Sequence, residues 1–276
     1  MANFHSDEWI MDKIQEHYQE ALEFYPADRI IGIFCQGSQN YGLDYEGSDI
    51  DTKCFLVPTL EDIIFNKKPI STTHIRANEE HIDFKDIRLF LTTVRKQNLN
   101  FMEILFTKYK IVNPTYEPMW NRLIENNEQI ARYNPVGAVK TMKGIALEKY
   151  HALEHRYPSK VELIDKYGYD PKQLSHLVRV HEYLQRYING EAYADCLLTQ
   201  NADVLIRVKR TDVLYIPLAR AKAWATDVLD DVVNIADTFA AAHKDEPVDW
   251  HVDELLDDVQ REIMKLGIEL EMQKGE

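Results

Sequence analysis

The feature that most constrains the fold is an uneven distribution of secondary-structure signals along the chain. Short runs rich in β-branched and aromatic residues, which are typical of strands, are concentrated before residue 112. After Pro114, apolar residues mostly recur at spacings of three and four, which indicates amphipathic helices. We therefore predict an α+β fold, with a small mixed β-sheet domain over residues 1–112 and a mostly α-helical domain over residues 113–276.

The elements expected in each part follow from these patterns. Strands are predicted over residues 29–35, 49–57 and 80–85, helices over residues 7–24, 60–66 and from Asp86 onward, and a loop over residues 67–79. In the second part, helices are predicted over residues 117–130, 136–155, 171–188, 217–242 and 251–271, and residues 202–210 are a possible strand.

Composition and charge exclude several classes of protein. The chain has 276 residues, of which 45% are hydrophobic and 28% charged, as in ordinary globular proteins. No apolar run approaches the roughly 18 residues of a membrane span, and the first residues lack a signal-peptide pattern. The three cysteines form no Cys-x-x-Cys pair, so we expect reduced thiols and no zinc knuckle. These observations predict a cytoplasmic protein with no membrane partner.

Charge is distributed unevenly. The formal net charge is -14, and residues 227–276 hold 15 Asp and Glu against 4 Lys and Arg, a local charge of -11. Residues 132–222 hold 15 Lys and Arg against 10 Asp and Glu, a local charge of +5. The acidic total argues against non-specific duplex binding, whereas the basic stretch either faces a phosphate-bearing ligand or is a solvated surface. The acidic C-terminal helices have apolar faces that either pack within the chain or form a homo-oligomer.

A polar, glycine-rich segment joins the first two predicted strands. It contains Gly-Ser-Gln-Asn-Tyr-Gly at 37–42 and Ser-Asp-Ile-Asp at 48–51. Gly37 permits an unusual backbone conformation, and Ser38 offers a hydroxyl and a main-chain N–H. If a helical turn begins there, its free N–H groups point toward any nearby anion. The segment therefore predicts a seat for the phosphates of a nucleotide.

Three carboxylates are candidates for metal binding. Asp49 and Asp51 are two residues apart in a predicted strand, so their side chains share one face of the sheet. Asp83, in the third predicted strand, would add a carboxylate if that strand lies alongside. Asp86 is its rival for this role, although we interpret Asp86 as a helix cap, and Glu79 and Glu80 are weaker alternatives. Mg²⁺ or Mn²⁺ prefers such oxygen ligands and would suit an in-line displacement at phosphorus.

Together these motifs resemble the signature of the DNA polymerase β-like nucleotidyltransferase superfamily. Within it, the chain is similar to predicted nucleotidyltransferases of bacteria and their phages, which combine Gly-Ser-x-x-Tyr/His-Gly and Ser-Asp-x-Asp with Leu-Arg-x-Phe and His-x-x-Arg helices. This sequence has Ile-Arg-Leu-Phe at 87–90 and His-Leu-Val-Arg at 176–179. The signature covers about residues 29–95 and continues more loosely to about residue 210. Gln39 stands where relatives often have Arg, which puts a phosphate contact there in doubt.

The resemblance implies a small mixed sheet, a divalent metal and an NTP donor such as ATP. It implies that Gly37 and Ser38 contact phosphates and that Asp49, Asp51 and Asp83 bind the metal. Gly42 and Ser48 belong to the same signature, and we predict that they line the nucleotide site. The expected reaction moves an NMP to a hydroxyl of RNA, a tRNA end, a protein or a small molecule. The alternatives are a catalytically weak nucleotide-binding regulatory protein and an RNA-binding module with the same fold.

A second group of candidates lies in the basic stretch. His176 and Arg179 are one helical turn apart and share a face, with Lys172 on the preceding turn. We predict that this face contacts the triphosphate or an acceptor phosphate, and the alternative is surface ion pairing around a histidine at the edge of the core. Tyr41 is the one tyrosine within the glycine-rich segment, where it stacks on a base or packs the loop.

Overall fold

A five-stranded mixed sheet forms from the apolar runs of the first part of the chain. The computed structural model describes residues 3–210 and 212–274. The strand order is β3-β4-β2-β1-β5; β2 and β4 are parallel and the other neighbours are antiparallel. The strands are β1 (Ile30–Gln36), β2 (Asp51–Leu56), β3 (Ser71–Ile75), β4 (His81–Asp86) and β5 (Lys110–Val112). The α+β class predicted from the sequence is confirmed.

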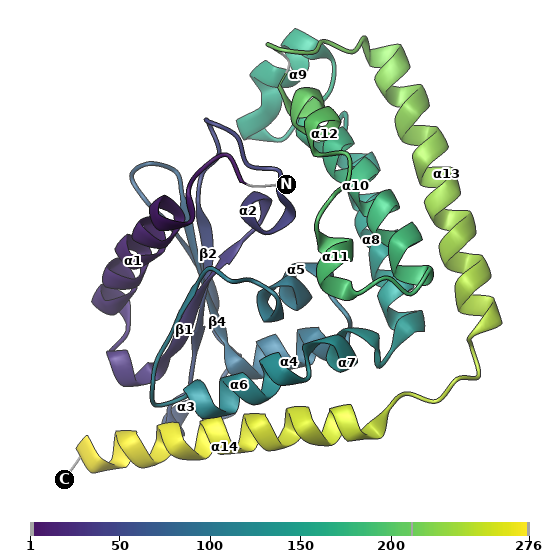
Figure 1. The fold of residues 1–276 in the computed structure, drawn as a ribbon. Coiled ribbons are helices and arrows are strands. Elements are labelled where there is room, and N and C mark those ends of the chain that lie inside the picture. Colours follow the sequence, from purple (N-terminus) through teal and green to yellow (C-terminus); the bar gives the residue numbers. More distant parts are fainter. Residues whose placement is uncertain (1–2, 211, 275–276) are drawn as a thin grey trace. The chain divides into compact units, whose positions relative to one another are not determined.

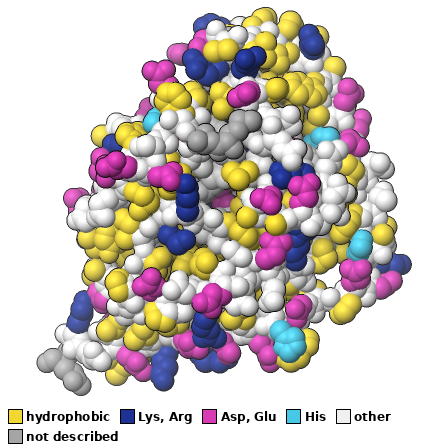
Figure 2. Space-filling model, in the orientation of Figure 1, with side chains coloured by type: hydrophobic (Ala, Val, Ile, Leu, Met, Phe, Trp, Pro, Cys, Tyr) yellow, Lys and Arg dark blue, Asp and Glu magenta, His cyan; other side chains and the backbone are white. Residues whose placement is uncertain are grey.

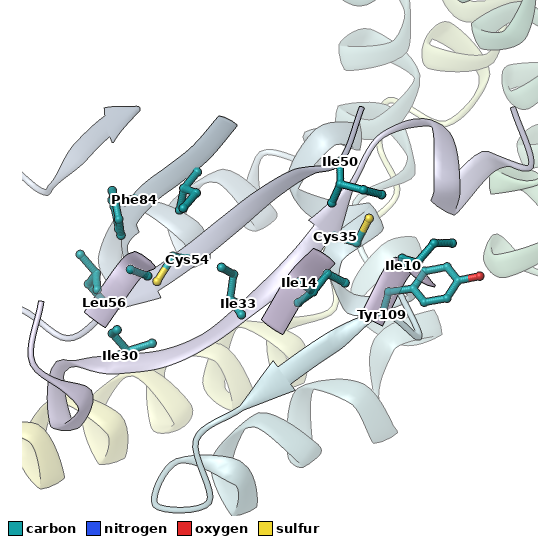
Figure 3. Packing of buried hydrophobic residues seen from close by; sticks show 12 residues of the cluster. Ile10, Ile14, Ile30, Ile33, Cys35, Ile50, Cys54, Leu56, Phe84 and Tyr109 are labelled. Atoms are coloured by element: carbon teal, nitrogen blue, oxygen red, sulfur yellow. The ribbon is translucent and has the colours of Figure 1, made fainter. Parts of the chain in front are cut away.

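Helix α1 (Asp7–Phe24) covers one face of this sheet (Figure 1). Ser6 caps it by accepting the Trp9 N–H at 3.1 Å. Its apolar stripe is buried against alternate residues of the strands, and Ile10 and Ile14 point into the same cluster as Ile33, as Figure 3 shows. Because side chains alternate along a strand, this face takes every second residue of β2 and β4, whereas a register shift near the start of β1 places both Ile30 and Ile33 in the cluster.

The opposite face is aromatic over one part and polar over another. Phe34 and Phe55 lie in contact with Trp120 and Phe90, and the ring centroids of Phe34 and Trp120 are 4.4 Å apart. These rings come from α4 (Ile87–Arg95) and α6 (Glu117–Glu125) as well as from the sheet. Nearer the start of β2 the same face carries polar side chains. The packed aromatic cluster therefore lies next to these polar side chains on one face of the sheet.

The C-terminal helix, α14 (Trp250–Lys274), packs against α4 and α6 (Figure 1). Arg95 pairs with Asp253 at 3.2 Å, and the Glu271 carboxylate accepts the Leu60 N–H at 2.8 Å. Gly267 is the point of closest approach, since a Cβ built there would lie 2.3 Å from Cγ1 of Val57. The helix is thus fitted to the sheet unit in detail.

Two compact units divide the chain differently from the predicted boundary at residue 112. The first comprises residues 1–40, 44–134 and 248–276, and the second comprises residues 41–43 and 135–247. The first unit therefore also includes α6, α7 (Asn127–Arg132) and α14, which belong to the predicted helical domain. Helix α6 packs on the sheet through Trp120, and α14 packs in turn on α4 and α6, which explains why both group with the sheet.

The second unit is helical. Its three long helices pack on one another and are α8 (Pro135–Ala152), α10 (Pro171–Ile188) and α13 (Leu218–Ala242). The short helix α12 (Ala202–Lys209) packs on α10, where the Ser175 hydroxyl donates to the Leu205 carbonyl at 3.0 Å. The remaining short helices of the chain are η1 (Ala27–Arg29), α2 (Ser38–Tyr41), α3 (Leu60–Ile64), α5 (Leu99–Met102), η2 (Glu103–Leu105), η3 (Pro158–Lys160), α9 (Val161–Tyr167) and α11 (Tyr193–Leu197).

Three elements differ from the sequence predictions. The expected loop at 67–79 contains β3, an edge strand with mostly exposed side chains, so it lacks the apolar alternation that identifies a strand. Residues 202–210, a possible strand, form α12 instead, because burial of Leu205 and Val208 against α10 selects helical spacing. The predicted helix 117–130 is interrupted at Asn126. Among the described helices none has the length and apolar character needed to span a membrane.

Candidate functional site

The glycine-rich segment turns sharply where β1 ends. Gly37 has a φ of 93° and Gly42 a φ of 67°, both in the left-handed region that side chains with a Cβ rarely adopt. A Cβ at either position would meet nothing within 4 Å, so the requirement for glycine comes from the backbone rather than from lack of space. Between them α2 is a single helical turn beginning at Ser38, which meets the condition under which the sequence places free N–H groups here.

Glu103 stabilises this turn through hydrogen bonds that its carboxylate accepts. Its buried carboxylate accepts the Gly37 N–H at 3.4 Å and the Asn40 side-chain amide at 3.3 Å. Asn40 also donates to the Cys35 carbonyl at 2.9 Å, and its amide oxygen accepts the Thr107 hydroxyl at 2.7 Å. Sequence reasoning missed Glu103, although one acidic residue within the apolar segment 100–106 was a usable signal.

Asp51 and Asp83 lie on the same face of adjacent strands. In the parallel register of β2 and β4, Lys53 is opposite Asp83, and Asp51 is two residues before Lys53. One Asp51 oxygen accepts the His81 N–H at 2.9 Å. The Asp83 carboxylate accepts the Thr73 hydroxyl and, at 3.1 Å, the side-chain amide of Gln36. The structure thus brings together the two carboxylates that the sequence placed on separate strands.

The pKa of Asp83 shows how strongly its charged form is favoured. Burial raises this pKa, but the hydrogen bonds from Thr73 and Gln36 and the charges of Lys85 and Lys53 outweigh burial and lower it. Asp83 is therefore ionised at neutral pH, as a ligand for a cation must be.

Lys53 adds a positive charge to this face. Its side chain is buried and donates to the Gln36 side-chain oxygen. Burial lowers its pKa, while the carboxylates of Glu103, Asp83 and Asp51 act in the opposite direction. Strand alternation placed Lys53 beside Asp51 from the start, yet the sequence prediction did not use it. The face therefore holds a buried lysine whose pKa is lowered by burial and raised by three nearby carboxylates.

Asp49 and Ser48 precede the strand. Asp49 is exposed, and β2 begins only at Asp51; the Asp49 carbonyl accepts the Gln39 side-chain amide at 2.8 Å. The Ser48 hydroxyl accepts the Tyr45 N–H at 2.9 Å and closes a turn. Ser38 donates its hydroxyl to the Gln39 side-chain oxygen at 3.3 Å. These residues belong to one loop, in which the Gln39 side chain links Ser38 to Asp49 by hydrogen bonds.

The rival acidic residues have other structural partners. Asp86 is buried, caps α4 by accepting the Arg88 N–H at 2.8 Å, and pairs with the Arg88 guanidinium at 2.6 Å. Glu80 is buried and accepts from His17 at 3.0 Å and from Arg76 at 2.6 Å. Its other oxygen accepts the Ile50 N–H at 3.4 Å. The helix-cap interpretation of Asp86 is therefore what the structure shows.

The donor atoms of Asp49, Asp51 and Asp83 are carboxylate oxygens, which suit Mg²⁺ or Mn²⁺. Within residues 3–210 and 212–274, however, no three His, Cys, Asp or Glu side chains gather closely enough to hold a metal ion. The predicted convergence on one cation is thus incomplete: Asp51 and Asp83 share a face, and Asp49 lies outside the strand. The chemistry of the donors fits a divalent ion, but their present arrangement does not enclose one.

The remaining predicted residues, Gly42, His176 and Arg179, belong to the second unit. Both His176 and Arg179 lie on α10, and the Arg179 guanidinium carbon is 3.7 Å from the centroid of the Tyr41 ring. Burial lowers the pKa of His176 well below its usual value, and the positive charges of Arg179 and Lys209 lower it further. His176 is therefore neutral at pH 7, and the charge of this group resides on Arg179 and the lysines.

Comparison with known proteins finds similar solved structures. No family model matches the chain, and no curated protein matches it. A nucleotidyltransferase-like protein from Exiguobacterium sibiricum 255-15, solved at 1.90 Å, is matched over 96% of this chain and 92% of that one. The chain is similar to that nucleotidyltransferase-like protein. The sequence identity is 10% and the TM-score 0.29, values that support no statement about substrate or reaction.

Proposed function

We propose that the chain is a nucleotidyltransferase that moves an NMP from an NTP to a hydroxyl acceptor and releases pyrophosphate. The observation that carries this proposal is the placement of Asp51 and Asp83 on one face of adjacent parallel strands. Gln36, the last residue of β1, is opposite Asp51, donates to Asp83 and directly precedes Gly37. Carboxylates and a sharply turned Gly-Ser segment therefore meet at one end of the sheet unit.

Each part of this site would have a separate task. Gly37 and Ser38 would contact the phosphates, with Ser48 and Gly42 shaping the loop that follows. Asp49, Asp51 and Asp83 would hold Mg²⁺ or Mn²⁺, which when bound neutralises phosphate charge and favours attack by the acceptor. In the transfer, the acceptor hydroxyl gives its proton to water and its oxygen forms a bond to the α-phosphorus. The bond from the α-phosphorus to the oxygen bridging to the β-phosphate breaks, and pyrophosphate leaves with that electron pair.

The residues around the carboxylates would prepare the site before substrate enters. Thr73 and Gln36 hold Asp83 in its ionised form, and Glu103 fixes the Gly37 turn through its N–H. Lys53 balances the negative charge of the face. The acceptor would be RNA, a tRNA end, a protein or a small molecule, and the donor an NTP such as ATP.

The direct test is transfer of label. Wild-type chain is incubated with each α-phosphate-labelled NTP, with Mg²⁺ or Mn²⁺, and with pools of tRNA, protein and small alcohols. We expect label in one acceptor pool with wild type and none with Asp49→Asn/Asp51→Asn. Asp12→Asn, an exposed aspartate of α1, is the matched control and should transfer normally. Labelling by the double variant, or no labelling by wild type under any condition, would refute the proposal.

One observation favours a second candidate, a nucleotide-binding protein that transfers nothing. The carboxylates are not gathered into a metal-holding group among the described residues, and the buried Lys53, a potential phosphate ligand, lies on the same face as Asp51 and Asp83. In that case ATP would bind without divalent ions, and Lys53→Met would weaken binding while Asp51→Asn would not. Isothermal titration with and without EDTA separates the two candidates, because the enzyme requires the metal and the binding protein does not.

The third alternative, an RNA-binding module, stays a prediction. On the face drawn in Figure 2, Lys and Arg side chains are scattered among Asp and Glu side chains rather than gathered into a stripe. Affinity for RNA that falls steeply with salt and survives Asp49→Asn/Asp51→Asn would favour it.

A further inference from the structure

Arg179 is a buried cation whose hydrogen-bonding capacity is largely unused. The side chain is 4% exposed, and among the described residues neither Nε nor Nη1 has a hydrogen-bond partner. A buried guanidinium normally has a carboxylate or several carbonyl oxygens around it, because removing a charge from water is costly. No acid of residues 3–210 or 212–274 forms an ion pair with Arg179. The position therefore calls for an anion that is not part of the chain.

The one ring contact of Arg179 leaves its donors available. Tyr41 is buried and lies against the face of the guanidinium, with 3.7 Å between the guanidinium carbon and the ring centroid. Stacking uses the face of the guanidinium plane, whereas its N–H groups point outward within that plane. Tyr41 thus orients the group without satisfying its edge.

The segment that carries Tyr41 is fastened to the helical unit. The Tyr41 carbonyl accepts the Thr199 N–H at 3.4 Å, and the Leu43 carbonyl accepts from the Lys209 ammonium at 3.5 Å. Gly42 between them has a positive φ, which supplies the bend. Arg179 is therefore held in one orientation by groups that come from α10, α12 and residues 41–43.

Several cations act on His176, which lies one helical turn before Arg179 on α10. The groups that act most strongly on nearby His176 are the cations Arg179, Lys209, Lys172 and Lys149. Glu182, one turn after Arg179 on the same helix, is occupied by the Thr199 hydroxyl at 2.6 Å and the Gln200 N–H at 2.6 Å. The balance of charge here is the opposite of that on the carboxylate face, so the site favours a multiply charged anion.

We propose that Arg179, oriented by Tyr41 and supported by Lys209, binds a phosphate group through Nε and Nη1. The planar edge of a guanidinium matches two oxygens of a phosphate. The choice of phosphate over carboxylate rests on the proposed nucleotidyltransferase function, in which phosphates come from the NTP or from the end of a nucleic-acid acceptor. The shared chemistry is a terminal phosphate, and the two sources are distinguished by experiment.

The test measures binding of defined probes to the full chain by isothermal titration. The probes are tripolyphosphate, ATP, and an RNA oligonucleotide with and without a 5′-phosphate. Arg179→Lys keeps the positive charge but loses the planar guanidinium edge that can donate two hydrogen bonds. We expect affinity for the preferred probe to fall about tenfold or more, which is the value of one charge-assisted hydrogen bond. Arg220→Lys, an exposed arginine of α13, is the matched control and should bind as wild type does.

A structural role for Arg179 would show in a second measurement. Arg179→Met removes an unpaired buried charge and keeps the packing, so its melting temperature should equal or exceed that of wild type while probe binding is lost. A large fall in melting temperature together with unchanged binding by Arg179→Lys would overturn the inference. Non-saturable binding of every probe to wild type, an adventitious ion only, would also overturn it.

The outcomes also separate this site from the proposed function. Preference for ATP and tripolyphosphate assigns the site to the donor, and dependence on the RNA 5′-phosphate assigns it to the acceptor. Asp51→Asn/Asp83→Asn should abolish transfer yet leave tripolyphosphate binding at Arg179 intact. Binding that depends on Arg179 without any transfer by wild type would support the phosphate site and refute the enzyme.

Discussion

The carboxylate face of the sheet unit and Arg179 of the helical unit differ in how far their charged side chains have hydrogen-bond partners within the chain. In the sheet unit, Asp51, Asp83 and Glu103 have hydrogen-bond partners, and their charges act on the buried Lys53. On α10, the guanidinium of Arg179 is buried with two donor atoms unsatisfied by any described residue. The charges of the first region are therefore compensated by groups of the chain itself, whereas the charge of Arg179 would be compensated by the phosphate proposed above.

The largest expected effect distinguishes the reactive carboxylate from the structural one. Asp83→Asn should lower label transfer about 100-fold, since it removes a charge from the site. Asp86→Asn should instead cost about 1–3 kcal/mol of stability, because it weakens the α4 cap and the pair with Arg88. Initial rates per folded molecule and melting curves measure both. Loss of transfer by Asp86→Asn alone, with normal melting, would reverse the assignment.

A smaller effect compares a helical glycine from each unit. At Gly267 a methyl group would overlap Val57, and overpacking of this kind costs about 1–3 kcal/mol. At Gly144, on α8, a Cβ would meet nothing within 4 Å, so alanine should stabilise by up to about 1 kcal/mol through helix propensity. Thermal denaturation should therefore show Gly267→Ala melting below wild type and Gly144→Ala at or above it. Equal shifts would mean that α14 does not fit as closely as described.

The last comparison concerns the far face of the sheet, where the Glu80 carboxylate contacts both His17 and the Ile50 N–H. Burial raises the pKa of Glu80, but the hydrogen bond from His17 and its other partners outweigh burial and lower it to about 2. Because the folded pKa lies below the unfolded value of 4.5, the stabilisation is present above pH 4.5 and is lost as pH falls toward 2.

This sets a pH-dependent expectation for Glu80→Gln. The variant should be less stable than wild type by about 1–3 kcal/mol at pH 7, and the gap should shrink on acidification below pH 4.5. Glu79→Gln, at an exposed neighbouring position, is the control and should differ little at any pH. A gap that stays constant from pH 7 to pH 2 would show that Glu80 contributes through packing rather than charge.

Much of the fold could be predicted from the sequence because its strongest signals are local. The apolar runs of β1, β2 and β4 and the helical spacing of α8, α10 and α13 appear within short windows. Edge strand β3 could not be found in this way, since Ser71–Ile75 is a strand only through pairing with β4. The placement of α14 on the sheet unit likewise depends on contacts with residues far away in sequence, such as Leu60.

In the candidate site, too, local patterns could be predicted from the sequence and contacts between distant residues could not. Strand alternation placed Asp51 and Asp83 on polar positions, and a helical turn placed His176 near Arg179. The support from Glu103 and the stacking of Tyr41 on Arg179 join residues more than sixty positions apart, and no local pattern encodes such contacts. Asp49 was expected within the strand, but β2 begins two residues later, and strand ends are set by pairing rather than by composition.

The position of α14 has a consequence for how the protein is made. Residues 248–276 complete a unit whose other parts lie before residue 135, so the ribosome must finish some hundred intervening residues first. During that interval the surfaces of Val57 and Tyr116 that receive Gly267 are uncovered and open to chaperones. Docking of α14, once it has emerged from the ribosome, thus completes the sheet unit.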